Sequence, residues 1–299
     1  MRPDLRLLLI AALPGCQADK SIDSQGVDTP LVLAAFNVGT TPYLDALGES
    51  SHRSTCETWY DNNLCLDTAE ASAASALERL SPDFTVLVEV WTPERCEDPD
   101  RPTVVDEAPY VCAQSGHQVN RLLPGHTFEC AEDYPDLCIA TAPGWSPRTQ
   151  ATGLPTDCQR AGRTTHQTFT TRWETVTVLA VHFQAGASGE DRDCRLEQIG
   201  AVDAFLTENP PRDDHALWMA GDFNFDVGLE GVEAVAWAEV ADRHGLVRVP
   251  DDGDTSVLLG VDLDAAYVRG TPSLTHCTLL TADSDLEAPM FDHALLGCN

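Results

Sequence analysis

Apolar residues along this chain gather in short runs, each bounded by polar or turn-forming residues. The clearest runs occupy residues 31–36, 84–90, 175–182 and 216–220. Runs of this length, between turn signals, are typical of buried strands, whereas helices usually extend further and repeat every 3.6 residues. The pattern therefore predicts buried strands at these positions. Further strands are predicted at 137–142, 166–171, 261–270 and 274–281, and a last strand-like run lies at 290–296.

Three longer stretches carry the pattern of helices. An Ala-rich stretch begins at Thr68 and runs to about Leu80, and two more helices are predicted at 191–208 and 232–244. In the helix at 191–208 the apolar residues fall near one face and charged residues on the other, as in a helix that packs on a core. Two stretches with neither pattern are predicted to be irregular: 92–136 and 143–162.

The run at 216–220 ends in a feature that a core does not need. It stops at Gly221, and Asp222 and Asn224 follow two residues apart. In a strand, such residues point to the same face, so both would project from the strand end. Gly221 would let the backbone approach its neighbours closely. The alternative is a simple turn, which Asp and Asn often form, and the stretch alone leaves both interpretations open.

Other apolar runs also end in polar residues that carry chemistry. Glu89 lies inside an apolar run, where an ionised carboxylate needs a partner or a metal; a solvated strand edge is the alternative. Carboxylates are the hard oxygen ligands that Mg²⁺ and Ca²⁺ take, and histidines transfer protons. Together these groups form the set needed for metal-assisted phosphoester hydrolysis. The residues at or near strand ends are Asn37, Glu89, His182, Asp222, Asn224, Asp264, Asp292 and His293.

The N-terminus has the pattern of an export signal. Arg2 and Arg6 precede an apolar stretch at 7–13, which is typical of a short secretory signal. The following Leu-Pro-Gly-Cys resembles the bacterial lipobox, in which Cys16 is lipidated and becomes the new N-terminus. A terminal strand or helix is a weaker interpretation, because Pro-Gly would break it. We expect a signal peptide at 1–15, the lipidated Cys and a polar linker at 16–29, and one domain at 30–299.

The cysteine count supports an oxidising compartment. Of 11 cysteines, 10 remain after Cys16 is lipidated, enough for up to five disulfides in an exported chain. A zinc site is the alternative, but the sequence holds no C-x-x-C pair. Short separations favour Cys56–Cys65 and Cys130–Cys138, and the remaining assignment is Cys96–Cys112, Cys158–Cys194 and Cys277–Cys298.

The net charge of the chain limits the kinds of molecule that it can attract. The formal charge at pH 7 is −30, which opposes broad capture of nucleic acid because such capture needs a basic patch. An acidic chain does suit a carboxylate-rich cation site.

The ordered set of polar strand ends resembles the endonuclease/exonuclease/phosphatase superfamily, which includes pancreatic deoxyribonuclease, apurinic endonucleases, neutral sphingomyelinases and inositol-polyphosphate phosphatases. The matching pieces follow the family's order and span residues 31 to 296. They are Phe36-Asn37-Val38, Pro82-Asp83, Leu87-Val88-Glu89-Val90, Val181-His182-Phe183, Arg195-Leu196-Glu197-Gln198, Gly221-Asp222-Phe223-Asn224, Leu263-Asp264, Tyr267-Val268 and Asp292-His293.

The resemblance implies an α/β fold with two packed mixed β-sheets flanked by helices, a four-layer sandwich like that of deoxyribonuclease. It also implies a role for each site residue. Glu89 resembles the principal metal ligand, with Asn37 and Asp292 near the cation, and Asn37 also near the phosphate. Asp222 resembles the residue that orients or deprotonates the attacking water, and Asn224 the one that holds the phosphate.

The two histidines and Asp264 complete the implied site. His293 would contact the scissile phosphate, with Asp264 fixing its tautomer and favouring its charged form. His182 resembles the general acid that assists the leaving oxygen. Arg195 and Gln198 are expected to organise helix packing.

The expected function is divalent-metal-dependent hydrolysis of a phosphoester by an exported, envelope-anchored, monomeric enzyme. The cation is expected to be Mg²⁺, with Mn²⁺ and Ca²⁺ as alternatives. Nucleic acid is the first choice of substrate. A sphingomyelinase-like phospholipid phosphodiesterase comes second, because the lipid anchor would be the protein's contact with a membrane, and an inositol-phosphate phosphatase third. A binding module without catalysis is the alternative from a different class.

Overall fold

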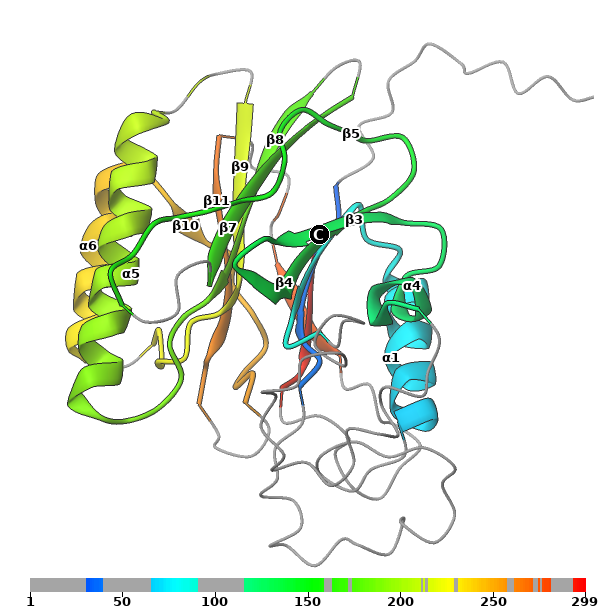
Figure 1. The fold of residues 1–299 in the computed structure, drawn as a ribbon, viewed down its shortest axis with the longest axis horizontal. Helices are drawn as coiled ribbons and strands as arrows, with labels where there is room; N and C mark the ends of the chain where they lie inside the picture. The colour runs from blue at the N-terminus through cyan, green and yellow to red at the C-terminus, as the bar shows by residue number, and fades with distance from the viewer. Residues whose placement is uncertain are drawn as a thin grey trace, which may run out of the picture.

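The computed structural model describes most of the chain from residue 31 onward. The described residues are 31–39, 66–90, 116–158, 163–171, 174–210, 212, 215–228, 231–256, 261–270, 274, 276–280 and 293–299. They form four layers, in which two β-sheets face each other and helices cover both outer sides (Figure 1). The predicted α/β sandwich of mixed sheets is therefore confirmed.

The first sheet has six strands in the order β12-β13-β1-β2-β4-β3. Its central pair, β1 and β2, is parallel, and every other neighbouring pair is antiparallel. The strands are β1 (Leu33–Asn37), β2 (Phe84–Val88), β3 (Thr127–Ala131), β4 (Tyr134–Thr141), β12 (Cys277–Leu280) and β13 (Leu295–Cys298).

The second sheet has seven strands in the order β10-β11-β9-β8-β7-β5, with β6 also paired to β7. Again one central pair, β8 and β9, is parallel. The strands are β5 (Ser146–Pro147), β6 (Thr152–Gly153), β7 (Thr164–Thr170), β8 (Thr175–His182), β9 (His215–Asp222), β10 (Val247–Arg248) and β11 (Asp264–Arg269).

In the part of the chain that the structure describes, two helices cover each sheet. Helices α1 (Leu66–Leu80) and α4 (Gln118–Leu122) lie on the first sheet, and α5 (Gly189–Glu208) and α6 (Val232–His244) lie on the second (Figure 1). The Ala-rich sequence of α1 lets it pack closely, because Ala73, Ala76 and Leu77 are all fully buried. The described part of the chain contains no helix that is long and apolar enough to cross a membrane.

Both faces of the central strands are buried, which explains their continuous apolar runs. In β1, Leu33 and Ala35 face the core between the sheets, whereas Ala34 and Phe36 face the core under α1. Trp218 of β9 is fully buried between the sheets and meets Phe84 of β2 edge-on, with ring centroids 5.4 Å apart. This packing fixes the two sheets relative to each other, and with them the strand ends.

Three predicted disulfides are confirmed. Cys130–Cys138 joins β3 to β4, Cys277–Cys298 joins β12 to β13, and Cys158–Cys194 ties the loop after β6 to α5. They fit an oxidising compartment. Residues Cys16, Cys56, Cys65, Cys96 and Cys112, and the predicted signal and linker, lie outside the described residues.

Part of the stretch predicted to be irregular is ordered. Helix α4 and strand β3 lie within 92–136, and the short strands β5 and β6 lie within 143–162. The sequence patterns there are weak because tertiary contacts define these elements. His117 caps α4 by accepting the Val119 N–H at Nδ1, and β3 depends on its pairing and disulfide with β4.

Candidate active site

The topology gathers the predicted site residues at one edge of the sandwich. The parallel strands β1, β2, β8 and β9 all end there, and the antiparallel strands β11 and β13 begin there. His182 and Asp264 both lie in register with Asp222 on neighbouring strands. Glu89 directly follows β2, and His293 lies two residues before β13. Side chains from six strands therefore converge although their positions in the chain are far apart.

Asp222 lies at the centre of this edge and is almost fully buried. Its Oδ2 accepts a hydrogen bond from Asn37 Nδ2 at 3.1 Å. His182 Nε2 and His293 Nε2 each lie 3.9 Å from the same oxygen. Burial raises the pKa of the Asp222 carboxyl to about 7; His293 opposes the rise, and the charges of Asp264 and Glu89 add to it.

The turn after Asp222 combines the two interpretations that the sequence left open. Strand β9 ends at Asp222, so Asn224 does not project from a continued strand as predicted. Instead, Asp222 Oδ1 accepts the Asn224 N–H at 2.7 Å, and Asn224 adopts a left-handed φ of 53°. Its side chain donates to the Phe183 carbonyl at 3.0 Å. The stretch is thus both a turn and one wall of the site.

Gly221 is required by the same close packing. Its φ is 135°, and a Cβ at this position would collide with the Val181 carbonyl of the neighbouring strand. A side chain here would push β9 away from β8 and separate His182 from Asp222.

Glu89 is partly exposed, with 39% of its side chain accessible. It has a left-handed φ of 59°, a costly conformation that is tolerated where the surroundings require it. Its Oε1 lies 3.5 Å from His182 Nε2, so it faces the site although it is partly solvated.

The surroundings of Glu89 fit a divalent cation. A Cβ on Gly39 would collide with the Glu89 carboxylate and lie 2.9 Å from Asn37 Oδ1, so Gly39 leaves room for these two oxygen donors. The site also brings the carboxylates of Glu89, Asp222 and Asp264 close together, and a cation would offset their repulsion. Asp292, the third predicted ligand, lies outside the described residues.

A second group of possible ligands is Asp222, Asp264 and His293, whose ligand atoms lie within 4.8 Å of one another. His293 Nδ1 and Asp264 Oδ2 are 2.6 Å apart, however, which is a short hydrogen bond between the two residues. Asp264 therefore holds the His293 ring beside Asp222, and this arrangement explains the three residues better than a cation site does.

The two histidines are held by different partners. His293 Nδ1 pairs with the Asp264 carboxylate, as the resemblance implied. His182 Nδ1 lies 3.3 Å from the hydroxyl of Tyr134, the first residue of β4. No sequence pattern indicates a role for Tyr134, because it lies in the stretch without periodicity and no local feature links it to His182.

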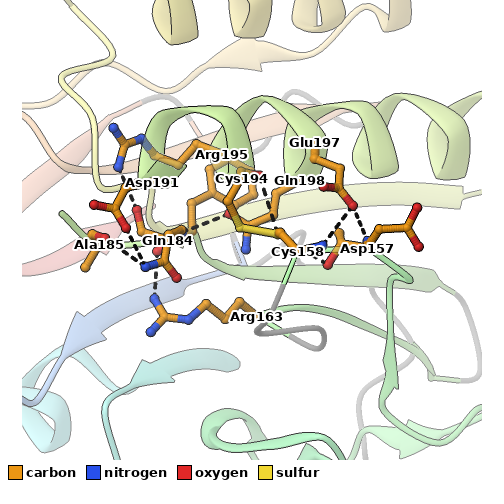
Figure 2. The surroundings of a disulfide bond; sticks show 12 residues. Asp157, Cys158, Arg163, Gln184, Ala185, Asp191, Cys194, Arg195, Glu197 and Gln198 are labelled. Carbon is orange, nitrogen blue, oxygen red and sulfur yellow. Dashed lines mark hydrogen bonds between the residues drawn. A yellow bond between two sulfur atoms is a disulfide. The ribbon is translucent and has the colours of Figure 1, made fainter. Parts of the chain in front are cut away.

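Helix α5 holds the segment after His182 through Arg195 and Gln198, two residues that were predicted to organise helix packing. Arg195 Nη1 donates to the carbonyls of Gln184 and Gly186 at 2.8 and 2.7 Å, and Gln198 Oε1 accepts the Gln184 N–H. Figure 2 shows Gln184 beside these side chains, next to the disulfide that links Cys194 of α5 to Cys158. Arg195 also pairs with Glu233 of α6 at 2.8 Å. These contacts fix the backbone next to His182.

Searches with the sequence find no matching family model and no matching curated protein. Solved structures are similar in fold. D. rerio TDP2, in complex with a single-strand DNA product, matches with a TM-score of 0.58 and 16% identity over 91% of this chain and 98% of that chain. The catalytic domain of human nocturnin, with a bound sulfate anion, matches with a TM-score of 0.57 and 13% identity over 90% and 93%.

Beta toxin from Staphylococcus aureus, a double mutant with bound magnesium ions, matches with a TM-score of 0.54 and 13% identity over 90% of this chain and 99% of that chain. At these identities the likeness concerns the fold alone. The chain shares with these three structures the α/β sandwich fold that the sequence resemblance implied.

Proposed function

We propose that this chain is a divalent-metal-dependent phosphodiester hydrolase. The observation that carries the proposal is the convergence of three carboxylates, two histidines and two asparagines on one edge of the sandwich. A fold needs none of these groups there, and a buried cluster of carboxylates costs stability unless positive charge offsets it. A non-catalytic binding module would have no use for the two partnered histidines.

Glu89 and Asn37, with Asp292, would hold the cation. When bound, it supplies positive charge that stabilises the phosphoryl oxygens as the reaction proceeds. We prefer Mg²⁺, with Mn²⁺ and Ca²⁺ as alternatives, because the donors are oxygen atoms and the described part of the site contains no cysteine. The magnesium-bound beta toxin of the same fold supports this choice.

The protein groups divide the proton transfers between them. Asp222, whose pKa burial raises to about 7, accepts the proton of the attacking water. The water oxygen bonds to phosphorus, the bond from phosphorus to the leaving oxygen breaks, and His182 Nε2 gives that oxygen its proton. The products are a phosphomonoester and an alcohol. His293, with Nδ1 held by Asp264, stabilises the phosphoryl oxygens through Nε2, and the second amide hydrogen of Asn224 is available to the phosphate.

Nucleic acid is the proposed substrate class, acted on by an exported enzyme held at the cell envelope through Cys16. TDP2 was solved with a single-strand DNA product, which supports a strand of nucleic acid as the substrate of this site. A phospholipid phosphodiesterase is the second candidate, because lipidation of Cys16 would hold the domain beside a membrane.

One panel of assays tests the function and the substrate class. Purified protein is incubated with single-stranded DNA, RNA, sphingomyelin vesicles and bis(p-nitrophenyl) phosphate, with Mg²⁺ or with EDTA. We expect Mg²⁺-dependent cleavage, fastest for the nucleic acids, and a loss of about 10² to 10⁴-fold in Asp222→Asn. The matched control is Asp203→Asn, which changes a carboxylate on α5 that contacts α6. Turnover that is absent for all substrates, or equal in Asp222→Asn and wild type, contradicts the proposal.

A further inference from the structure

We propose that Tyr134 is a positioning residue for His182, and that its hydroxyl holds the imidazole with Nε2–H directed toward Glu89 and Asp222. The inference rests on the proposed function, since it assigns the device that orients the group acting at the leaving oxygen. Neither residue is near the other in sequence, and they belong to different sheets, His182 to β8 and Tyr134 to β4.

The contact between the two residues is made by one atom of each. The Tyr134 hydroxyl lies 3.3 Å from His182 Nδ1, at the long end of hydrogen bonds. The ring centroids are 5.7 Å apart with an interplanar angle of 57°, so the rings are tilted and do not stack. His182 is 2% exposed, so water has little access to the ring. The hydroxyl is therefore a directional contact at Nδ1.

The surroundings of His182 assign the tautomer. Its Nε2 faces Glu89 Oε1 at 3.5 Å and Asp222 Oδ2 at 3.9 Å. A carboxylate oxygen accepts hydrogen bonds, and that of Glu89 is the nearer, so the proton of a neutral ring is favoured at Nε2. Nδ1 is then an acceptor, and the Tyr134 O–H donates to it. When the ring is charged, Nδ1–H donates and the same hydroxyl accepts. The acid that protonates the leaving oxygen is the charged ring, which keeps Nδ1–H when Nε2 gives up its proton, so the hydroxyl accepts from Nδ1 both before and after that step. Because a phenol hydroxyl can both donate and accept, it can hold His182 in the same orientation in every protonation form.

The ring of Tyr134 is itself held in place by Arg163. The Arg163 guanidinium lies over its ring, 4.9 Å from the centroid, a cation–π contact. Arg163 is 3% exposed and donates to the Phe183 carbonyl at 2.9 Å, the same oxygen that accepts from Asn224. Arg163 thus ties the Tyr134 ring to the backbone next to His182.

The hairpin that carries Tyr134 is also cross-linked. Strands β3 and β4 meet at a turn just before Tyr134, and the disulfide Cys130–Cys138 joins opposite residues of these strands. A register shift between Cys130 and Ala131 marks the strand end at the turn. The hydroxyl therefore lies on a short hairpin that a disulfide closes. Such a restrained hairpin is suited to positioning a side chain, and not only to filling space in the core.

Tyr134→Phe removes the hydroxyl and keeps the ring, so it separates positioning from packing. A group that protonates the leaving oxygen matters when the leaving alcohol is a poor one, and little when it is p-nitrophenol. We expect Tyr134→Phe to lower kcat about tenfold on a diester with an alkyl leaving group, with KM unchanged, and less than about twofold on bis(p-nitrophenyl) phosphate. In a His182→Ala background the substitution should have no further effect on either substrate.

Tyr267→Phe is the matched control, because Tyr267 lies in the core and its ring packs on Trp237 of α6, with ring centroids 5.1 Å apart. It should show no dependence on the leaving group. An equal loss on both substrates in Tyr134→Phe, or wild-type kcat on both while His182→Ala is selectively impaired, overturns the proposal.

A second readout does not depend on turnover. ¹⁵N chemical shifts of the His182 ring in the metal-free protein report which nitrogen carries the proton. We expect the Nε2–H form in wild type and in Tyr267→Phe, and in Tyr134→Phe a displaced Nδ1 resonance that reports the loss of the hydrogen bond at that nitrogen. Identical ring shifts in wild type and Tyr134→Phe overturn the proposal even if the protein hydrolyses no tested diester, so failure of the inference and failure of the proposed function are told apart.

Discussion

The two sides of the site hold their histidines in different ways. His293, which leads into β13 of the six-stranded sheet, is paired with the Asp264 carboxylate of the seven-stranded sheet at 2.6 Å. His182, at the end of β8 in the seven-stranded sheet, meets the Tyr134 hydroxyl of the six-stranded sheet at 3.3 Å. A carboxylate stabilises positive charge on an imidazole, whereas a hydroxyl serves the neutral and charged rings alike. The first arrangement suits a fixed charge beside a phosphate, and the second suits a proton donor.

In both cases the partner comes from the opposite sheet. The Asn37–Asp222 hydrogen bond crosses between the sheets in the same way, from β1 to β9. The site therefore depends on how the two sheets pack, and the buried core between them, including Phe84 and Trp218, is what sets the distances at the edge. Substitutions on each side of the site should therefore distinguish the roles of the two histidines experimentally.

Asp264→Asn should have the largest effect. Replacing the carboxylate with an amide removes the charge that stabilises the His293 imidazolium and can favour the other tautomer, so we expect kcat to fall about 10³ to 10⁴-fold. The fall should be the same for alkyl and p-nitrophenyl diesters, because His293 acts on the phosphoryl oxygens. Steady-state kinetics with both substrates measure this.

The control for that variant is Asp262→Asn, two residues earlier, where the carboxylate pairs with Arg248 and not with a site histidine. It should keep most of its activity. Comparable losses in the two variants would mean that the Asp264 effect is structural.

Opening the disulfide Cys130–Cys138 should disturb the His182 side alone. The cross-link spans 8 residues, and a double Cys→Ala variant should lose about 2 to 3 kcal/mol of unfolding free energy. It should also lose activity selectively on alkyl diesters, because the hairpin that carries Tyr134 is loosened. Urea unfolding and the two-substrate assay measure the two effects.

Cys277–Cys298 provides the comparison on the other side. It spans 21 residues next to β13, so its removal should cost about 3 kcal/mol. The activity that the variant without Cys277–Cys298 loses should not depend on the leaving group. If both disulfide variants show the same dependence, the hairpin has no special part in positioning His182.

Gly39→Ala should weaken the cation site. The added Cβ would displace the Glu89 carboxylate, which lies on the His182 side, and leave the His293–Asp264 pair in place. We expect the Mg²⁺ concentration needed for half-maximal activity to rise about 10 to 100-fold. Titration of activity with Mg²⁺, and of the protein with Mg²⁺ by calorimetry, would measure the shift; unchanged curves would place the cation elsewhere.

Another histidine–carboxylate pair shows what the contact made by His293 does away from the site. His244 Nε2 and Asp203 Oδ1 are also 2.6 Å apart, between α6 and α5. The hydrogen bond from His244 lowers the pKa of the Asp203 carboxyl below its ordinary value of 3.8. A lowered folded-state pKa stabilises the fold above the unfolded pKa, and this stabilisation is lost as the pH falls through the folded value.

Asp203→Asn should therefore have the smallest effect. At pH 7 we expect a loss of about 0.2 to 1 kcal/mol, the range of exposed ion pairs, with activity unchanged. The difference from wild type should shrink as the pH falls well below 3.8. Thermal unfolding across this pH range would show it, and a constant difference at all pH values would contradict the assignment.

The sequence predicted much of this site because strand ends are marked locally. Apolar runs that stop at Asn37, Glu89, His182 and Asp222 located β1, β2, β8 and β9, since both faces of these strands are buried and their composition shows it. Tyr134, Arg163 and the placement of Gly39 were not predictable in this way. Tyr134 contributes through a contact between sheets, and α4 and β3 form through pairing, capping and a disulfide that leave no periodic pattern.

The central claim is that His182 and His293 serve one phosphodiester in different roles. It is tested most directly by comparing His182→Ala and His293→Ala on alkyl and p-nitrophenyl diesters in the presence of Mg²⁺. We predict that His182→Ala loses about 10² to 10⁴-fold on the alkyl substrate and far less on the p-nitrophenyl substrate, whereas His293→Ala loses equally on both. Losses that depend on the leaving group to the same extent in both variants would contradict the account.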